Sequence, residues 1–345
     1  MTPTAAPNDP LMATAPHLSD ADALAVLTTH WGITGHLTRL SSERDLNFLV
    51  RTDQNAFVLK IANPQEPILV TDFQTKALLH LADCAPTLPV PRVIPSRDGS
   101  AMVYAPQGTI RLLSYLEGEL LHKAAPSSCL RTSLGAIAAQ ISNGLTGFSH
   151  PAEQHFLQWD LKNAAHLRPM LADISDVDLR TCATSALDHF DEYVQPALAN
   201  CRQQVVHNDL NPHNIVLDPA DHGVVAGIID FGDMVKTPLV CDLAIAAGYL
   251  IDSGNPEQSI AAVVESFHQH LHLTKSELSL VYDLVLLRYV TTLAITSHRA
   301  ALFPQNAAYI LRNFASASMG FLALSAVNRT EFCLALAKRC LTRTT

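Results

Sequence analysis

Three side chains between residues 209 and 230 have the types and the spacing that phosphoryl transfer requires. Asp209 and Asn214 are five positions apart, and Asp230 begins the tripeptide Asp-Phe-Gly. In kinases a catalytic-loop Asp accepts the proton of the attacking hydroxyl, while an Asn and a second Asp bind Mg²⁺ beside the phosphates. Each residue alone is also compatible with a turn or a helix cap. Together they indicate a catalytic base, Asp209, and two metal ligands, Asn214 and Asp230.

The chain around these residues is predicted to fold as a hairpin. Apolar residues follow the polar loop at 215–217 and return at 224–229, after a turn at 218–223. This pattern is typical of two short strands with polar residues at both ends. Within the loop, His207 is expected to support the backbone rather than to react. Asp233 follows the predicted metal ligand by three positions, and it could cap the next segment or hold a cationic substrate.

The composition indicates a globular protein with a sizeable core. The chain has 345 residues, 48% of them hydrophobic and 16% charged, which fits one large domain or two lobes. A net charge of −9 argues against a nucleic-acid partner. Seven Cys without a Cys-x-x-Cys pair indicate reduced thiols in a cytoplasmic protein. The apolar tracts at 243–251 and 281–296 are interrupted by polar residues, so we expect buried helices and no membrane contact. The oligomeric state is left open.

The order of the expected elements predicts an α+β protein with a small sheet lobe and a larger helical lobe. A flexible leader is expected over 1–17, and a nucleotide-binding lobe with a small antiparallel sheet over 18–116. Residues 117–345 are expected to form the catalytic and substrate-binding lobe. Its predicted helices span residues 127–145, 160–171, 176–199, 239–251, 256–271, 274–296, 304–322 and 328–341.

The motifs resemble those of the aminoglycoside phosphotransferase / choline kinase superfamily, whose fold is bilobal and protein-kinase-like. The family motif His-Gly-Asp-Leu-His-x-x-Asn corresponds to His207–Asn214, and its metal motif corresponds to Ile229–Asp233. The stretches 42–48, 147–151 and 229–246 look closest to the hydroxylysine kinase branch. The resemblance begins near residue 20 and covers most of the chain.

This resemblance implies a small-molecule kinase that uses Mg²⁺ and transfers the γ-phosphoryl group of ATP or GTP to a hydroxyl. The acceptor would be a small amine or amino acid, with 5-hydroxylysine first. Homoserine, choline, ethanolamine and aminoglycosides are the alternative acceptors. A non-catalytic nucleotide-binding module is the alternative from another class, although the intact motif residues argue against it.

The resemblance also implies nucleotide-binding residues in the first lobe. Lys60 ends an apolar strand and would reach the α- and β-phosphates. The family often pairs this Lys with a helix Glu, but alignment places Gln74 there, which can accept a hydrogen bond and cannot neutralise charge. Residues 40–48 contain no Gly, so Ser41 and Ser42 could offer hydroxyls or backbone amides to phosphate, unless they form an ordinary polar hairpin.

Residues of the helical lobe are expected to line the acceptor pocket. An amino-acid acceptor needs an acidic partner for its ammonium and an Arg for its carboxylate. Inter-helix salt bridges are the alternative explanation for each charged residue named. The candidates are Asp233, Trp159, Asp160, Arg288 and Arg299, with Tyr289 and His298 nearby on the same late helices.

Overall fold

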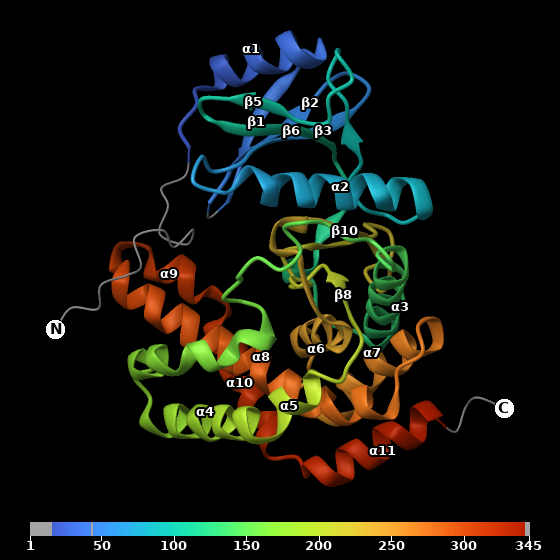
Figure 1. Ribbon diagram of the computed structural model, residues 1–345, viewed down its shortest axis with the longest axis vertical. Coiled ribbons are helices and arrows are strands. Elements are labelled where there is room, and N and C mark those ends of the chain that lie inside the picture. The colour runs from blue at the N-terminus through green and yellow to red at the C-terminus, as the bar shows by residue number, and fades with distance from the viewer. Residues whose placement is uncertain (1–15, 43, 342–345) are drawn as a thin grey trace. The chain divides into compact units, whose positions relative to one another are not determined.

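The computed structural model describes residues 16–42 and 44–341, so nearly all of the expected leader lies outside the described residues. The chain divides into two compact units (Figure 1). The first contains the chain up to Glu117 together with Ser149–Glu153, and the second contains the rest. The division after Glu117 lies one residue from the predicted boundary. The assignment of 149–153 to the first unit differs from our expectation.

The first unit is an antiparallel sheet with two helices. Its strands are arranged in the order β1-β2-β3-β6-β4, and β5 pairs with β6. The predicted sheet lobe is therefore confirmed, whereas the two-residue strand β4 was too short to be predicted from alternation. The elements are α1 (Asp20–Trp31), β1 (His36–Leu40), β2 (Leu46–Arg51), β3 (Ala56–Ile61), α2 (Ile68–Cys84), β4 (Val93–Ile94), β5 (Val103–Ala105) and β6 (Gly108–Ser114).

The two faces of this sheet have different environments. Leu59 and Ile61 of β3 are fully buried in one hydrophobic cluster with Leu27 of α1. Because successive residues of a strand point to opposite faces, Lys60 lies on the other face. On that face Arg111 of β6, which is paired in register with Lys60, hydrogen-bonds to Gln74 of α2. Alternation along β3 thus separates the apolar core from a polar layer that contains Lys60.

The segment 149–153 binds α2 through a buried histidine. Nε2 of His150 donates to Oδ2 of Asp72 over 3.0 Å, because Nδ1 accepts from the backbone N–H of Ala152. The His150 ring stacks on Phe73, with ring centres 5.5 Å apart. This segment therefore packs as part of the first unit, although its neighbours in sequence belong to the second.

The second unit is mainly helical, and each predicted helical region contains helix. The region 160–171 is a 3-10 helix, and the region 304–322 is broken into short turns before α10. The elements are β7 (Glu119–Leu120), η2 (Leu121–Lys123), α3 (Ser128–Gly144), η3 (Leu161–Asp173), α4 (Val177–His189), η4 (Phe190–Val194), α5 (Gln195–Leu198), β8 (Gln203–Val206), β9 (Ile215–Leu217), β10 (Val225–Ile228), η5 (Phe231–Asp233), β11 (Val235–Pro238), α6 (Leu239–Tyr249), α7 (Pro256–His270), α8 (Lys275–Leu302), η6 (Pro304–Asn306), α9 (Ala307–Ile310), η7 (Leu311–Asn313), α10 (Phe314–Ser325) and α11 (Arg329–Leu341).

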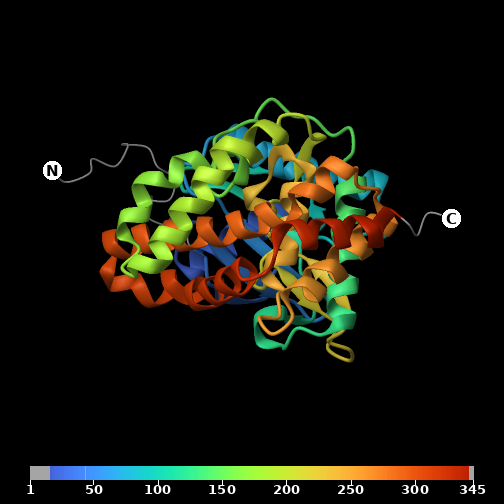
Figure 2. The ribbon, with the colours of Figure 1, turned by 90° about the horizontal axis from the view of Figure 1, so that it is seen from below.

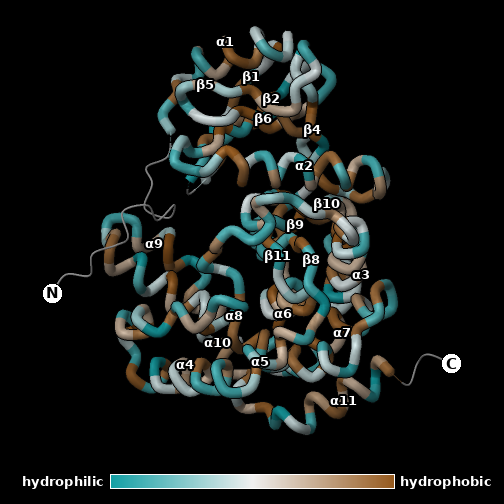
Figure 3. The backbone as a smooth tube through the Cα atoms, viewed as in Figure 1, coloured by the Kyte–Doolittle hydropathy of each residue, from teal (hydrophilic) through white to brown (hydrophobic). Residues whose placement is uncertain are grey.

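Helix α8 is the central helix of the second unit. It packs against η3, α6, α10 and α11 (Figure 2). By length and composition alone it could cross a membrane, but 89% of its most apolar window is buried inside the unit. Figure 3 shows the apolar residues along this helix and its neighbours. The expectation that the tract 281–296 forms a buried helix is confirmed.

Candidate active site

The predicted hairpin is present and places two candidate metal ligands at one end. Strands β9 and β10 are antiparallel, with Ile215 opposite Ile228. The next backbone hydrogen bond runs from the N–H of Ile229 to the carbonyl of Asn214, over 2.9 Å. The ladder therefore brings Asn214 beside Asp230, although the two are far apart in sequence.

Asp209 is held by two side-chain amides. Its Oδ2 accepts hydrogen bonds from Nδ2 of Asn214 at 2.7 Å and from Nδ2 of Asn211 at 2.8 Å. Nδ2 of Asn214 also donates to the backbone carbonyl of Asp209 at 2.9 Å. The Asp209 side chain is 23% exposed, so the carboxylate is fixed in position while part of it still faces solvent.

The residues at the hairpin end fit a divalent cation. Because Asn214 uses its amide nitrogen to hold Asp209, its amide oxygen is left to face a ligand. Asp230 is exposed and adopts a left-handed backbone conformation with φ of 60°, which is uncommon for a residue other than Gly and is typical of functional sites. A carboxylate and an amide oxygen are hard donors that suit Mg²⁺ when phosphates complete its coordination. Within the described residues no group of three or more His, Cys, Asp or Glu could hold a metal ion.

His207 supports the catalytic loop. Its Nδ1 accepts from the backbone N–H of Asp209 at 3.2 Å, so Nε2 carries the proton that it donates to the carbonyl of Ile229 at 3.1 Å. Burial lowers the pKa of His207, and neighbouring carboxylates only partly oppose this shift. The imidazole is therefore neutral at physiological pH and connects the loop to the strand before Asp230.

A second anchor holds the residue before the base. Oδ1 of Asp242, on α6, accepts from the backbone N–H of Asn208 at 2.7 Å. Asn208 has φ of 65°, a conformation that Asn tolerates better than most residues. Asp242 therefore anchors this loop from the first turn of α6.

The surroundings of Asp209 suit a base at neutral pH. Burial and the charge of Asp233 raise its pKa to about 6, while Arg288 acts in the opposite direction. A general base works best when its pKa lies near the working pH. At pH 7 most Asp209 carboxylates would be ionised and able to accept a proton.

Arg288 lies beside Asp209 in a largely aromatic environment. Its Nη2 donates to the hydroxyl of Tyr249 at 2.9 Å and approaches Oδ1 of Asp209 at 3.4 Å. Cζ of Arg288 is 5.2 Å from the ring centre of Trp159 and 5.3 Å from that of Tyr249. The structure thus brings the predicted residues Arg288 and Trp159 to the base. Tyr249 was missed, because only tertiary packing places the end of α6 here.

Asp233 also belongs to this cluster. Its charge raises the pKa of both Asp209 and Arg288. It lies in η5, the short turn that follows Asp230. Both signs of charge therefore occur next to the base.

Asp160 does not belong to the cluster as a substrate residue. Its Oδ1 accepts from the hydroxyl of Thr237 at 2.7 Å, and Oδ2 pairs with Lys162 at 3.0 Å. The Asp160 side chain is fully buried, and it also caps η3. The expectation of a substrate contact is corrected because the carboxylate is engaged within the protein.

Three other candidates on α8 have positions or contacts that separate them from the base. Arg299 follows Arg288 by eleven positions, or about 16 Å along a helix axis, so the two cannot bind one small carboxylate. Tyr289 donates its hydroxyl to the carbonyl of Gly248 at 2.7 Å. Nδ1 of His298 lies 2.7 Å from Asp173. These contacts stabilise the helical packing.

In the first unit Lys60 and Gln74 have separate partners. Nζ of Lys60 lies 3.4 Å from Oδ2 of Asp45. Oε1 of Gln74 accepts from Nη2 of Arg111 at 3.0 Å. The Gln74 oxygen, which was expected to accept a hydrogen bond from Lys60, thus accepts one from Arg111. Sequence reasoning did not identify this second buried cation. Asp45 was also missed, although it stands within the stretch 42–48 that carried the family resemblance.

Ser41 and Ser42 are both exposed. Oγ of Ser42 accepts from the backbone N–H of Asp45 at 3.2 Å, so this serine shapes the turn before β2. Their role as phosphate donors stays a prediction.

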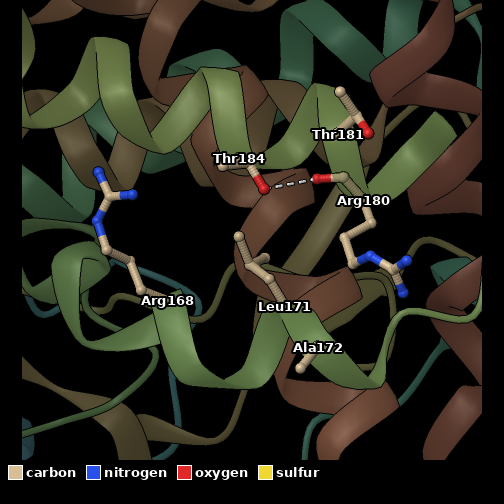
Figure 4. Close-up of a pocket in the computed structure, with 6 residues that line it drawn as sticks. All are labelled: Arg168, Leu171, Ala172, Arg180, Thr181 and Thr184. Carbon is tan, nitrogen blue, oxygen red and sulfur yellow. Dashed lines mark hydrogen bonds between the residues drawn. The ribbon is translucent and has the colours of Figure 1, made fainter. Parts of the chain in front are cut away.

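A cavity elsewhere in the second unit contains none of these residues. It has a volume of 430 Å³ and lies between η3 and α4 (Figure 4). Arg168 at one end pairs with Asp188 and Asp191, and the hydroxyl of Thr184 donates to the carbonyl of Arg180. The cavity lacks the carboxylate and amide cluster required for phosphoryl transfer.

Comparison with protein families and curated proteins yields matches over most of the chain. The model of the phosphotransferase enzyme family (APH) matches residues 36–276. Hydroxylysine kinase of Mus musculus is 29% identical over 327 residues, which cover 86% of each protein. Hydroxylysine kinase of Bos taurus is 28% identical over 329 residues, covering 86% of this chain and 87% of that protein.

Solved structures share the fold at low sequence identity. An amicoumacin kinase in complex with AMP-PNP, Ca²⁺ and Ami has a TM-score of 0.65 at 15% identity, covering 91% of this chain and 97% of that chain. A microcompartment-associated aminopropanol kinase has a TM-score of 0.63 at 16% identity, covering 92% and 97%. The kinase-like fold expected from the sequence is thereby confirmed.

Proposed function

Because the chain belongs to the phosphotransferase enzyme family, we propose that it transfers the γ-phosphoryl group of ATP or GTP to the hydroxyl of a small amine or amino acid. The observation that carries this proposal is the contact between Asp209 and Asn214 at the end of the hairpin that also presents Asp230. It combines a positioned carboxylate base with oxygen ligands for a metal ion.

Each residue has a defined chemical task in this proposal. Asp209 orients the acceptor hydroxyl and accepts its proton as the new O–P bond forms. Asn214 and Asp230 hold Mg²⁺, which when bound neutralises charge on the phosphates. Lys60 of the first unit binds the α- and β-phosphates, and Ser41 and Ser42 are further candidates for phosphate contacts.

The favoured acceptor is 5-hydroxylysine. The support is the similarity to hydroxylysine kinases from Mus musculus and Bos taurus over most of the chain. The presence of both Arg288 and Asp233 near the base also suits an acceptor that carries both charges. Homoserine, choline, ethanolamine and aminoglycosides are the competing acceptors.

We also infer a cytoplasmic location, because the cysteines form no disulfide.

The decisive test is a coupled assay that detects the nucleoside diphosphate product. It is run on the purified protein with ATP and with GTP, for each of these acceptors. We expect Mg²⁺-dependent turnover that is highest with 5-hydroxylysine and greatly reduced in Asp209→Asn. Nucleotide binding without metal dependence, together with no phosphorylation of any acceptor, would establish a non-catalytic binding module instead.

A further inference from the structure

The guanidinium of Arg288 is buried and has unused hydrogen-bond donors. The residue is 3% exposed, and its Nη2 makes the contacts to Tyr249 and Asp209. Nε and Nη1 are buried and have no hydrogen-bond partner among the residues that the structure describes. A guanidinium has five N–H donors, and unmet donors on a buried cation are costly. An acceptor group from outside the chain would remove this cost.

The charge and position of these donors favour a carboxylate. Nε and Nη1 lie on different edges of the guanidinium, so each donates separately, and a hydrogen bond from a charged donor to a carboxylate is stronger than one to a neutral group. The rings of Trp159 and Tyr249 both lie close to the guanidinium, with their centres 5.2 and 5.3 Å from Cζ. Because Nη2 lies 3.4 Å from Asp209, a molecule bound to Arg288 lies next to the base.

We propose that Arg288 binds a carboxylate of the acceptor, so that the enzyme acts on a hydroxylated amino acid and discriminates against the corresponding hydroxylated amine. This inference rests on the proposed kinase function and names the residue that selects within its substrate class.

A carboxylate that reaches these two buried nitrogens would have to displace a neighbouring side chain, for which Trp159 is the candidate. The Trp159 indole is partly exposed and has no hydrogen-bond partner within the described part of the chain. Tyr249, in contrast, is tied to Arg288 through its hydroxyl.

The experiment compares two acceptors that differ only in the carboxylate. We would measure kcat/KM for 5-hydroxylysine and for its decarboxylated counterpart, a hydroxylated diamine, in the wild type, Arg288→Met and Arg288→Lys. In Arg288→Met we expect kcat/KM for the amino acid to fall about 10- to 100-fold relative to that for the diamine. Arg288→Lys keeps the charge but presents one nitrogen in place of three, so its preference should be intermediate.

Arg299→Met is the matched control, since it makes the same change on the same helix far from Asp209. It should leave the ratio of the two kcat/KM values unchanged. Thermal unfolding and nucleotide affinity would show whether each variant is folded. If Arg288→Met does not fold, the ratio in Arg288→Lys decides.

Other outcomes overturn the inference in distinguishable ways. An equal loss for both acceptors in Arg288→Met would mean that Arg288 only positions Asp209. A wild type that prefers the diamine would contradict a carboxylate site directly. A folded wild type that phosphorylates neither compound and no other hydroxylated amine or amino acid would refute the proposed function itself.

Discussion

Asn214 donates its side-chain amide to Asp209 over 2.7 Å, so the residue expected to bind metal also positions the residue expected to accept the proton. This contact closes the polar loop over five residues and turns the Asn214 oxygen away from Asp209. The two tasks are therefore mechanically linked, and a change at Asn214 would disturb both.

Asp209→Asn should lower kcat by roughly 10²- to 10⁴-fold, because the amide keeps the shape of the side chain but cannot accept a proton. Nucleotide affinity should be unchanged. A coupled assay for turnover and titration calorimetry for binding would measure the two effects separately. Turnover close to that of the wild type would remove Asp209 from the role of base.

Asp230→Ala should weaken nucleotide binding in the presence of Mg²⁺ and change it little in its absence. The physical reason is the loss of the charged oxygen ligand at the hairpin end, since Asn214 alone offers one neutral oxygen. Nucleotide dissociation constants measured over a range of Mg²⁺ concentrations would test this without relying on activity. An unaltered dependence on Mg²⁺ would show that Asp230 does not bind the metal.

Gln74→Leu should destabilise the protein by about 1.5–3 kcal/mol, because it removes a hydrogen-bond acceptor from the guanidinium of Arg111, which is only 2% exposed. Gln74→Glu is the matched control, since it keeps an oxygen at the same position and adds an opposing charge. Denaturant unfolding of the two variants and the wild type would compare their stabilities. Equal stability of Gln74→Leu and the wild type would argue against a structural role for this contact.

Glu277 should make stability depend on pH. Burial raises its pKa, but hydrogen bonds from Arg202 and from the backbone of Thr274 outweigh burial and leave the pKa below its ordinary value. The unfolded chain therefore takes up the proton first, so this stabilisation is present above the unfolded pKa of about 4.3 and is lost as the pH falls through the folded pKa. Because the Arg202 side chain is 43% exposed, Glu277→Gln should cost only about 1–2 kcal/mol at pH 7.

Unfolding of Glu277→Gln and the wild type at pH 7 and at pH 4 would test this expectation. The difference should shrink at the lower pH. Asp188→Asn provides a control in the same unit, because Asp188 is paired with Arg168 on the surface and should contribute little. A difference that grows on acidification would contradict the assigned direction of the pKa shift.

The local parts of this structure could be predicted from the sequence because they depend on short-range patterns. An apolar run over 56–61 indicated the strand β3, and the family resemblance implied the role of Lys60 near its end. Apolar residues on both sides of a polar turn indicated the hairpin, and the observed ladder confirms it.

The partners of charged residues could not be predicted, because they depend on which elements pack together. Asp45 provides a carboxylate beside Lys60, because β2 and β3 are antiparallel and Leu46 lies opposite Ile61. Arg111 is fixed by the register between β3 and β6, which no sequence pattern specifies. Asp160 looked like a pocket residue but is buried against Thr237, a contact between segments 77 positions apart.

The five residues Ser149–Glu153 make the first unit discontinuous in sequence. A fragment that ended at Glu117 would lack the histidine that donates to Asp72 and stacks on Phe73. Chimeric enzymes that exchange the first unit between relatives must therefore carry both pieces from the same parent. If only the longer piece is exchanged, α2 will meet a foreign segment, and the loss of fit will be mistaken for a defect in catalysis.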